Sequence, residues 1–341
     1  MNKERIVVIG AGAIGGVTAA LMAEAGLDVT LVCKHLEIAT LAAGRGLHVT
    51  GFRGEHTTPV HSVADVAELT GTFDLCLIAT KAYDMPDCAR AMLPLLKPDS
   101  LVVSLQNGIC TDALAAVVGP ERTVGCVIGW GGTMHAPGEL EMTSGGDFVI
   151  GMLSGHTSPR LAALKAALDA VVPCRISEDI YAELYSKLIV NACITSLGAI
   201  CGLHLGEMMK RKRARQIFLA VIGEAVDVAR AMHLTVPPFG GKLDYFKLMA
   251  GTSPLDELRR HLMIRIVGMK YSKLKSSSLQ SLERGRPTEI DYFNGYIAAK
   301  GRALNVPCPV NERLTAMVKE IERHARSIDV KNLEDEGLLK K

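Results

Sequence analysis

The sequence predicts an α/β N-terminal domain with a doubly wound sheet, followed by an all-α C-terminal domain. Two observations predict this division. Up to about residue 173, short apolar runs of the kind that parallel sheets bury on both faces alternate with helical segments. Beyond this point, long segments with helical periodicity replace them. We expect domains at residues 1–178 and 179–330 and a loose polar C-terminal tail at 331–341.

The first domain opens with a complete β-α-β unit. An apolar strand at residues 5–9 precedes a glycine turn, a helix of small apolar residues at 17–25 and a second strand at 28–33. Further buried strands are expected at 74–80, 101–105 and 123–128, and the first two of these precede plausible helices. This alternation indicates a doubly wound sheet.

The second domain is expected to be helical throughout. The predicted helices lie at about 180–202, 205–233, 255–275, 287–304 and 310–328. The Pro-Pro-Phe-Gly-Gly stretch at 237–241 marks a break between two of them. The apolar run at 188–205 is long enough to consider as a membrane span, but Asn191, Thr195 and two glycines interrupt it, so a buried helix of a soluble protein is expected instead.

Composition argues against several classes of protein. Lys and Arg number 38 against 36 Asp and Glu, and this balance provides no electrostatic footprint for a nucleic acid or an anionic membrane. The densest basic run, at 210–215, is expected to be a solvated helix face. Nine cysteines without a C-x-x-C pair predict neither a disulfide framework nor a structural zinc site. Together with the lack of a secretory signal at the start, they indicate a cytoplasmic protein.

A glycine-rich turn joins the first strand to the first helix. Its residues are Gly10, Ala11, Gly12, Ala13, Ile14 and Gly15. They match G-x-G-x-x-G, in which glycines permit a tight turn, close approach of the backbone to a pyrophosphate, and tight packing of helix on strand. Because the match lies within a β-α-β unit, it predicts a Rossmann-type site with the pyrophosphate at the helix N-terminus. The alternative is a glycine-rich turn without a ligand.

The end of the second strand bears on the choice of nucleotide. NAD sites usually have an acidic residue here for the ribose 2′-hydroxyl, whereas this chain has Lys34. A cation suits a 2′-phosphate, so we expect NADP(H) as the cofactor. In the alternative, Lys34 is an ordinary loop lysine and Glu37 turns in to bind the ribose.

Two polar residues directly follow strands of the predicted sheet. Lys81 follows the strand at 74–80, and Asn107 follows the strand at 101–105. Open α/β sheets bind ligands at the carboxyl ends of their strands, so both are candidate site residues. Each alone would also suit an ordinary loop, and Asn107-Gly108 is a good turn dipeptide.

Polar residues form a stripe on the apolar helix predicted at 180–202. Lys187, Asn191 and Thr195 are four residues apart, and each step advances only about 40° around a helix. Since an unpaired charge in a core costs several kcal/mol, the lysine must reach water or meet a partner in a cleft. The alternative is that Lys187 extends to water from the start of the helix.

A second polar cluster lies near the end of the helical domain. It includes Ser277, in the run Lys-Ser-Ser-Ser-Leu-Gln, and Glu289, in the run Arg-Pro-Thr-Glu-Ile-Asp-Tyr. Helix capping would explain part of the pattern, because Thr288 resembles an N-cap and acidic residues are favoured in a first helical turn.

Five motifs in this order resemble the ketopantoate reductase (2-dehydropantoate 2-reductase) family. They are GAGAIGG, TKAYD, LQNG, KLIVNACIT and SSSLQ followed by GRPTEIDYFNGY. The resemblance covers about residues 5–325, and its last two motifs are much more specific than the glycine turn. It implies NADPH-dependent reduction of the 2-oxo group of ketopantoate to pantoate, as in pantothenate biosynthesis, in a cleft between the two domains. The implied partner is a small 2-oxoacid, and both a homodimer and a monomer fit the sequence.

The resemblance also implies roles for the residues at the chemistry. Lys187 is similar to the family's proton donor, and Asn191 and Ser277 to its substrate-binding residues. Asn107 is similar to an asparagine near the nicotinamide and the substrate. Glu289 matches the glutamate that supports this site, and it is assigned to both catalysis and cofactor binding. No metal is implied, because nicotinamide carries the hydride.

At the cofactor, Lys34 and Lys81 match positively charged residues of the family, and the backbone around Met134 matches a cofactor-contacting loop. Two departures concern the substrate. The family commonly has asparagines at the positions of Thr195 and Leu205. Thr195 keeps a substrate-binding assignment although it is shorter, whereas leucine cannot form a side-chain hydrogen bond.

These departures leave three interpretations of function. The first is a ketopantoate reductase, and the second is a reductase of the same architecture that acts on another 2-oxoacid or a related carbonyl. The third, a non-catalytic NADP-binding sensor, would not need Lys187 together with Glu289. The segment at 243–275 is long compared with compact family members, and it is expected to reshape the cleft or to build a subunit interface.

Overall fold

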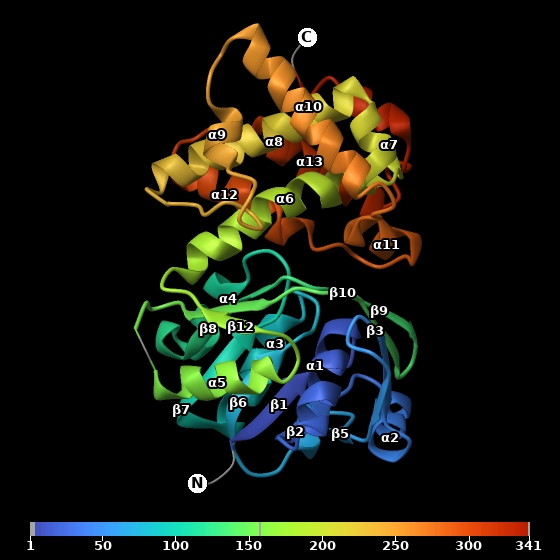
Figure 1. The fold of residues 1–341 in the computed structure, drawn as a ribbon, viewed down its shortest axis with the longest axis vertical. Helices are drawn as coiled ribbons and strands as arrows, with labels where there is room; N and C mark the ends of the chain where they lie inside the picture. Colours follow the sequence, from blue (N-terminus) through green and yellow to red (C-terminus); the bar gives the residue numbers. More distant parts are fainter. Residues whose placement is uncertain (1–3, 157, 340–341) are drawn as a thin grey trace. The chain divides into compact units, whose positions relative to one another are not determined.

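The computed structural model describes residues 4–156 and 158–339 and divides into two compact units, Met1–Leu184 and Tyr185–Lys341 (Figure 1). Among the described residues, the N-terminal unit contains all the strands of the two sheets, whereas the C-terminal unit is built from helices. The predicted fold class, a Rossmann-type doubly wound sheet followed by an all-α domain, is confirmed.

The main sheet of the N-terminal unit has the strand order β12-β11-β8-β7-β6-β1-β2-β5. Its strands are β1 (Arg5–Ile9), β2 (Asp28–Val32), β5 (His61–Val63), β6 (Phe73–Ile78), β7 (Leu96–Ser104), β8 (Thr123–Ile128), β11 (Phe148–Met152) and β12 (Cys174–Ile176). Neighbouring strands are parallel except β8 and β11. From β1 the chain continues to β2 on one side of the sheet, whereas from β6 it continues to β7 on the other side. The point between β1 and β6 is therefore a switch point, at which open α/β sheets bind ligands.

Helices and 3₁₀ turns connect these strands. They are α1 (Ala13–Glu24), α2 (Leu36–Gly44), α3 (Met85–Met92), α4 (Thr111–Val118) and α5 (Pro159–Asp169), with η1 (Val66–Glu68), η2 (Leu93–Leu95) and η3 (Pro120–Arg122). Helix α1 has small residues where it packs closely. A Cβ added to Gly16, for example, would lie only 2.6 Å from Cδ1 of Leu140, so glycine at this position admits the leucine of a neighbouring strand.

That strand belongs to a second sheet that sequence analysis did not predict. Its order is β4-β3-β10-β9, and it consists of β3 (Leu47–Gly51), β4 (His56–Thr58), β9 (Gly131–Ala136) and β10 (Glu139–Ser144). The sheet packs against α1. Its strands are short and many of their residues are half-buried or exposed, so they lack the continuous apolar runs that mark the main sheet.

The helical unit is formed around the long helix α6. Its elements are α6 (Ile180–Cys201), α7 (Leu205–Lys210), α8 (Lys212–Ala231), α9 (Tyr245–Met249), α10 (Pro254–Lys270), α11 (Ser277–Glu283), η4 (Ile290–Tyr292), α12 (Asn294–Ala303), α13 (Pro309–Glu322) and η5 (Val330–Glu334). Across the described ranges, α6 alone is long and apolar enough to cross a membrane. Because 83% of its most apolar window is buried inside the protein, it has the character of a core helix.

The predicted helix at 205–233 is interrupted, because the backbone is extended at Arg211 between α7 and α8. The basic run is therefore not simply a solvated helix face. The guanidinium of Arg215 donates to the carbonyls of Met209 (2.7 Å) and Lys210 (2.9 Å). These bonds satisfy acceptors that the end of a helix leaves without partners.

The expectation of a loose tail from residue 331 is wrong for its described part; residues 340–341 lie outside the described ranges. Leu333 and Leu338 are each only 1% exposed. The Asn332 side chain donates to the carbonyl of Ile200 at 2.8 Å. The Asp335 carboxylate accepts two hydrogen bonds from Arg313 at 3.0 and 2.7 Å. Apolar burial and charge-assisted bonds thus hold this segment on the helical unit.

Candidate active site

Two glycines of the glycine turn are required by the protein's own backbone. Gly10 has a φ of +109°, and a Cβ added there would lie 2.9 Å from the carbonyl carbon of Ala79. A Cβ added to Gly15 would lie 2.0 Å from the carbonyl oxygen of Gly10. Side chains are therefore excluded at both positions, and the turn packs tightly at the switch point between β1 and β6.

Gly12 is different, because nothing in the protein excludes a side chain there. It is the N-cap of α1, its φ of −74° suits any residue, and an added Cβ would meet no described atom within 4 Å. The first turn of α1 contains no acidic residue. The open space beside a helix N-terminus with free positive polarity fits a pyrophosphate, which supports the dinucleotide interpretation of the turn.

The strands around this turn end side by side. Ile9 of β1 pairs with Val32 of β2 on one side and with Ile78 of β6 on the other, and Ile78 pairs with Ser104 of β7. Since these strands are parallel, the loops that follow them leave the sheet at one edge. Except for Met134, the sequence-predicted residues of this unit follow these strand ends.

Lys34, Lys81 and Asn107 all lie on these loops, and all three are exposed. The structure therefore brings them to the same edge of the sheet as the glycine turn. Burial raises the pKa of the Cys88 thiol, and the Lys34 ammonium lies near enough to oppose this effect. The ammonium of Lys34 has no carboxylate partner in the described part of the chain.

The alternative role of Glu37 has an explanation within the helix. Glu37 is exposed in the first turn of α2. An acidic residue at this position is stabilised by the helix dipole without any ligand. The local structure of α2 therefore accounts for Glu37, whereas Lys34 lies ahead of the helix in the loop that follows β2.

Gln106 is a supporting residue that the sequence analysis did not single out. Its side-chain amide donates to the carbonyls of Ile78 (2.9 Å) and Thr80 (3.3 Å), and its carbonyl accepts from the hydroxyl of Ser104 (2.6 Å). The buried side chain thus ties the loop that carries Lys81 to the loop that carries Asn107. Its position next to Asn107 in the LQNG motif is the sequence feature that could have identified it.

Met134 lies in β9 of the second sheet and is partly buried against the core. Two residues earlier in the same strand, a Cβ added to Gly132 would lie 3.3 Å from Cβ of Ala13, the first residue of α1. The backbone of β9 therefore runs beside the N-terminus at which the glycine turn ends. This is the placement that a cofactor-contacting strand requires.

In the helical unit, Lys187 and Asn191 are half-buried positions on a helix whose other residues are mostly buried. Ser186, the residue before the lysine, is held through its backbone carbonyl and through its side chain. The Tyr245 hydroxyl donates to the carbonyl of Ser186 at 2.8 Å, and the Ser186 hydroxyl donates to the carbonyl of Pro237 at 2.8 Å. These two bonds, the first of them buried, fix the turn of α6 from which Lys187 projects.

Thr195 is more buried than the other two residues of the stripe, at 6% exposed. Its hydroxyl donates to the carbonyl of Asn191 at 2.7 Å, within the same helix. The hydroxyl therefore donates its proton inside α6, and towards a ligand it can act only as a hydrogen-bond acceptor.

The serine run packs against the C-terminal half of this stripe. Ser276 is the N-cap of α11, and its hydroxyl also lies 3.4 Å from the carbonyl of Thr195. A Cβ added to Gly198 would lie 2.5 Å from this hydroxyl oxygen, so glycine on α6 permits the close approach. Ser277 follows at the first position of α11 and is exposed.

Glu289 lies in a short segment that α13 holds in place. Glu289 itself is buried, with 8% of its surface exposed. The preceding Thr288 donates to Oε1 of Glu322 through its backbone N–H (2.7 Å) and its hydroxyl (2.6 Å). Lys319 lies 3.3 Å from the other oxygen of the same carboxylate. The sequence analysis missed Glu322 because it is 34 residues from Thr288 and belongs to no motif.

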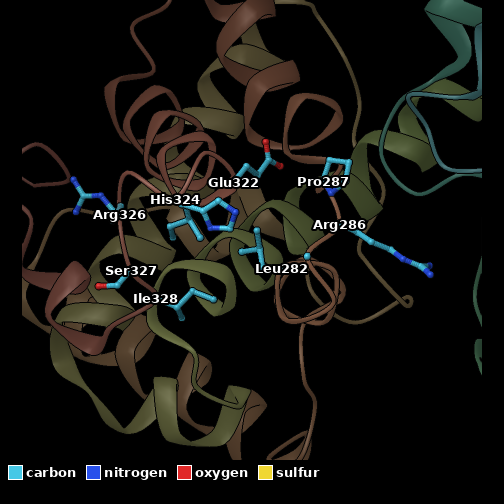
Figure 2. A pocket seen from close by; sticks show the side chains of 10 residues that line it. Leu282, Arg286, Pro287, Glu322, His324, Arg326, Ser327 and Ile328 are labelled. Atoms are coloured by element: carbon cyan, nitrogen blue, oxygen red, sulfur yellow. The ribbon is translucent and has the colours of Figure 1, made fainter.

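These bonds also explain why the helix predicted at 287–304 begins only at Asn294. Thr288 is not the N-cap of that helix, because its hydroxyl donates to Glu322 and accepts from the N–H of Ile290 in a 3₁₀ turn. A cavity of about 300 Å³ borders the same segment (Figure 2). Its lining comes from residues 285–287 and from the end of α13 with the residues that follow it.

Leu205 does not line an open site. It is 1% exposed at the start of α7, and its N–H donates to the carbonyl of Leu274 at 3.0 Å. Its side chain is therefore part of the packed core of the helical unit.

Comparison with known families covers both units. The family model described as ketopantoate reductase PanE/ApbA matches residues 6–155, and the model described as ketopantoate reductase PanE/ApbA C terminal matches residues 179–322. Among curated relatives, the 2-dehydropantoate 2-reductase of Archaeoglobus fulgidus is 27% identical over 323 residues, which cover 94% of this chain and 99% of the relative.

Solved structures show the same fold. A PanE/ApbA family ketopantoate reductase from Ralstonia eutropha JMP134 has a TM-score of 0.80 and 28% identity, over 94% of this chain and 99% of that chain. D-mandelate dehydrogenase, solved with NADH and anilino(oxo)acetate, has a TM-score of 0.77 and covers the same fractions. At 23% identity, the second comparison supports the fold alone.

Proposed function

The chain belongs to the ketopantoate reductase PanE/ApbA family of oxidoreductases, which act on a carbonyl or hydroxyl group, and we propose that it reduces the 2-oxo group of a 2-oxoacid with NADPH. Ketopantoate is the first candidate substrate, and the product would be pantoate, as in pantothenate biosynthesis. The observation that carries this proposal is the half-buried Lys187 on a mostly buried helix, with Asn191 one turn further along. A cytoplasmic location is part of the proposal, in keeping with nine free cysteines, eight of them buried.

The N-terminal unit is the proposed nucleotide site. The backbone at Gly12 and the N-terminus of α1 would hold the pyrophosphate, and Lys34 and Lys81 would hold further phosphate charge. Asn107 lies at the same edge of the main sheet as the glycine turn, and the strand that contains Met134 runs beside α1. Both would contact the nicotinamide end of the cofactor. When bound, the reduced nicotinamide supplies the hydride.

The helical unit supplies the groups that act on the substrate. Negative charge develops on the carbonyl oxygen as the carbon is reduced, and an ammonium at this oxygen stabilises the charge and donates the proton. We assign this role to Lys187. Asn191 and Ser277 have side chains suited to binding the carboxylate and the 2-oxo group, and the buried Glu289 would support the site from the segment held by α13.

A second candidate substrate is a 2-oxoacid without a distal hydroxyl group. Two observations favour it: the Thr195 hydroxyl donates within α6, and Leu205 is buried in the core. Both positions therefore offer less polar contact than the asparagines expected at them. A pocket that lacks these partners discriminates weakly in favour of a hydroxylated substrate. D-mandelate dehydrogenase is an example of the same fold in a protein solved with an oxoacid-type ligand.

Oxidation of NADPH, followed by its absorbance, tests the proposal with a panel of 2-oxoacids that includes ketopantoate. Lys187→Ala is expected to reduce kcat by about 10²- to 10⁴-fold, because the variant loses both the charge and the proton donor. Its NADPH affinity should not change. The matched control is Lys210→Ala, which removes an exposed lysine at the end of α7. Full activity in Lys187→Ala would reject the assigned role, and no turnover of any carbonyl by the wild type would reject the function.

The cofactor preference is tested separately with Lys34→Asp. An acidic residue at this position repels a 2′-phosphate and can accept a hydrogen bond from a ribose hydroxyl. The variant is therefore expected to lose about tenfold or more in NADPH affinity relative to NADH affinity. Titration of both nucleotides by fluorescence measures this ratio. An unchanged ratio would favour Glu37 as the residue at the ribose.

A further inference from the structure

The connection between α8 and α10, residues 232–253, folds back on itself in a tight turn. The N–H of Phe239 donates to the carbonyl of Leu243 at 2.9 Å, and the N–H of Leu243 donates back at 3.1 Å. Gly240 and Gly241 between them have φ values of +58° and +68°, a conformation that favours glycine. The Pro-Pro-Phe-Gly-Gly stretch is therefore part of a hairpin turn, which brings the residues on its two sides together.

Both sides of this turn bind the same residue of α6. Before the turn, the carbonyl of Pro237 accepts from the Ser186 hydroxyl at 2.8 Å. After the turn, the Tyr245 hydroxyl donates to the Ser186 carbonyl at 2.8 Å. Tyr245 and Ser186 are 1% and 3% exposed, so water competes little for the bond between them. The turn thus holds the side chain and the backbone of the residue that directly precedes Lys187.

The Tyr245 hydroxyl lies at the hydrogen-bond step of α6 that encloses Lys187. In an α-helix, the carbonyl of residue 186 pairs with the N–H of residue 190. Burial raises the pKa of the Tyr245 phenol well above its ordinary value, and the N–H of Val190 and the hydroxyl of Ser186 lie close enough to oppose part of this rise. The phenol therefore keeps its proton. It donates to the Ser186 carbonyl beside the helix's own bond, which the two lone pairs of a carbonyl permit.

This bond bears directly on the direction of the Lys187 side chain. The carbonyl oxygen of Ser186 and the Cα of Lys187 belong to the same rigid peptide plane. A donor at this oxygen therefore fixes the plane from which the lysine side chain starts. Because the ammonium lies at the end of a flexible four-carbon stem, a small rotation of the plane is enough to displace the charge from a reacting oxygen.

Tyr245 is itself held by residues outside α6. It is the first residue of α9, whose N-cap Asp244 accepts from the N–H of Lys247 at 3.0 Å. Towards the other end of α9, Arg260 of α10 donates to the carbonyl of Leu248 at 3.1 Å. Both bonds satisfy backbone groups that the ends of a helix leave without partners. Helix α9 also packs beside α8, as Figure 1 shows. The tyrosine is therefore presented to α6 from a fixed support.

We propose that Tyr245 is a positioning residue for Lys187. Its hydroxyl, together with the bond between Ser186 and Pro237, sets the direction in which α6 presents the lysine ammonium, and the hairpin turn keeps these two bonds together. This inference rests on the proposed function, because it takes Lys187 as the group that acts at the substrate oxygen. It also gives a role to part of the long segment at 243–275.

Tyr185 provides a comparison on the same helix. It is fully buried, and its hydroxyl donates to the carbonyl of Ala225 on α8 at 2.9 Å. This bond ties α6 to α8 and does not involve the peptide that precedes Lys187. The two tyrosines therefore allow the same chemical change, the loss of one buried hydroxyl, with and without an effect on that peptide.

Steady-state oxidation of NADPH, with the 2-oxoacid that the wild type reduces fastest, compares Tyr245→Phe with Tyr185→Phe. Tyr245→Phe should lower kcat about ten- to hundredfold, because it displaces the acting ammonium, and it should change KM far less. Tyr185→Phe should keep kcat within about twofold of the wild type. Urea unfolding should show similar losses of stability, since each variant loses one buried hydrogen bond. Equal kcat values for the two variants would overturn the proposal.

A double-mutant cycle tests whether Tyr245 acts through Lys187. If it does, Tyr245→Phe should leave the residual kcat of Lys187→Ala unchanged within about twofold. Additive losses would show that Tyr245 acts by another route and would reject the positioning role. Full activity of Lys187→Ala would reject the proposed function instead. An impaired Lys187→Ala beside a fully active Tyr245→Phe would reject the positioning role alone.

Ser186→Ala is a second variant that keeps Tyr245 and removes the bond to Pro237. It should lower kcat in the same direction as Tyr245→Phe but less, by about three- to tenfold. A Ser186→Ala variant with the kcat of the wild type would show that the turn does not act through this residue.

Amide hydrogen exchange provides a measurement that needs no turnover. Tyr245→Phe should speed exchange about three- to tenfold in the α6 peptide that contains Lys187 and Val190, because the helix step between Ser186 and Val190 loses its outside donor. Unchanged exchange in this peptide would overturn the proposal for any substrate of the enzyme.

Discussion

The two units present their candidate functional residues in different ways. In the N-terminal unit, the candidate site is formed mainly by the backbone. It consists of strands that end at one edge, glycines that allow a tight turn, and a helix N-terminus. In the helical unit, the candidates are side chains on α6, on α11 and in the segment at 287–290, and they come from parts of the chain about one hundred residues apart. Bonds from α13 and from Tyr245 and Ser186 hold them in place.

This difference explains how each region tolerates change. A site made of backbone depends on a few positions where no side chain fits, and its other positions are free to vary. A site made of side chains depends on the residues that hold them, which lie outside the motifs. Substitutions in the two regions should therefore fail for different reasons, and the following predictions are ordered by the size of the expected effect.

The largest effect is expected at Gly15, in the backbone-built region. An alanine Cβ would lie 2.0 Å from the carbonyl oxygen of Gly10, so Gly15→Ala should cost more than about 3 kcal/mol in the free energy of unfolding and abolish nucleotide binding. Gly12→Ala is the matched control, because a Cβ meets nothing there. It should change the free energy of unfolding by less than about 1 kcal/mol and weaken NADPH binding about tenfold or more.

Urea unfolding and nucleotide titration measure the two quantities for both variants. The comparison separates a glycine required by the fold from a glycine required by a ligand. Equal losses of stability in the two variants would contradict this distinction, and unaltered NADPH binding by Gly12→Ala would contradict the assigned place of the pyrophosphate.

The next effect is expected at Glu322, in the region built from side chains. Glu322→Ala removes the acceptor of both Thr288 hydrogen bonds and should cost about 2 kcal/mol in the free energy of unfolding. Because it loosens the segment that carries Glu289, it should also lower kcat about tenfold. Its NADPH affinity should fall less than its kcat, since most of the proposed nucleotide-binding residues belong to the other unit.

Glu322→Gln is the conservative control, because its amide oxygen can still accept from Thr288. Steady-state kinetics with each variant should show near-normal kcat for the glutamine variant and reduced kcat for the alanine variant. If both variants were equally impaired, the negative charge beside Lys319 would matter more than the hydrogen bonds to Thr288.

The smallest effect concerns the C-terminal segment and depends on pH. The guanidinium of Arg313 lowers the pKa of Asp335 from 3.8 to about 2. A carboxylate with a lowered pKa in the folded state stabilises the fold fully above its unfolded pKa and loses this contribution as the pH falls. Asp335 should therefore contribute about 2 kcal/mol above pH 3.8, and most of this should be lost by about pH 2.

Unfolding of the wild type and of Asp335→Asn across this pH range measures the contribution. The variant should be less stable near neutral pH, and its stability should fall less steeply below pH 3.8. Parallel pH profiles for the two proteins would show that the Arg313 pair does not hold the segment.

Much of the N-terminal unit could be predicted from the sequence because its signals are local. The strand expected at 5–9 is β1, the strand expected at 28–33 contains β2, and the glycine turn lies between β1 and α1 as expected. The second sheet could not be predicted in the same way. Its strands β3 and β10 are adjacent in space but about ninety residues apart in the chain, and neither is apolar throughout.

In the helical unit, periodicity predicted the long helices but not where they break. The late start of α12 and the ordered tail depend on bonds to distant residues. The interruption at Arg211 is accompanied by bonds from Arg215 to nearby carbonyls, and periodicity alone does not reveal them. Gln106 and Glu322 were missed for a related reason. Each is a common residue type whose role appears only when its partners, Thr80 and Thr288, are brought to it by the fold.

By itself, the sequence determined that a Rossmann-type unit precedes a helical one, that a glycine turn opens the first helix, and that Lys187, Asn191 and Thr195 share a helix face. Helical and strand periodicity and the steric freedom of glycine are properties of neighbouring residues, so they can be read from the chain. The tertiary structure alone decided that Thr195 is buried, that Glu322 holds the segment of Glu289, and that one face of α10 remains exposed. Burial and hydrogen-bond partners come from residues far apart in the chain, and only folding brings these together.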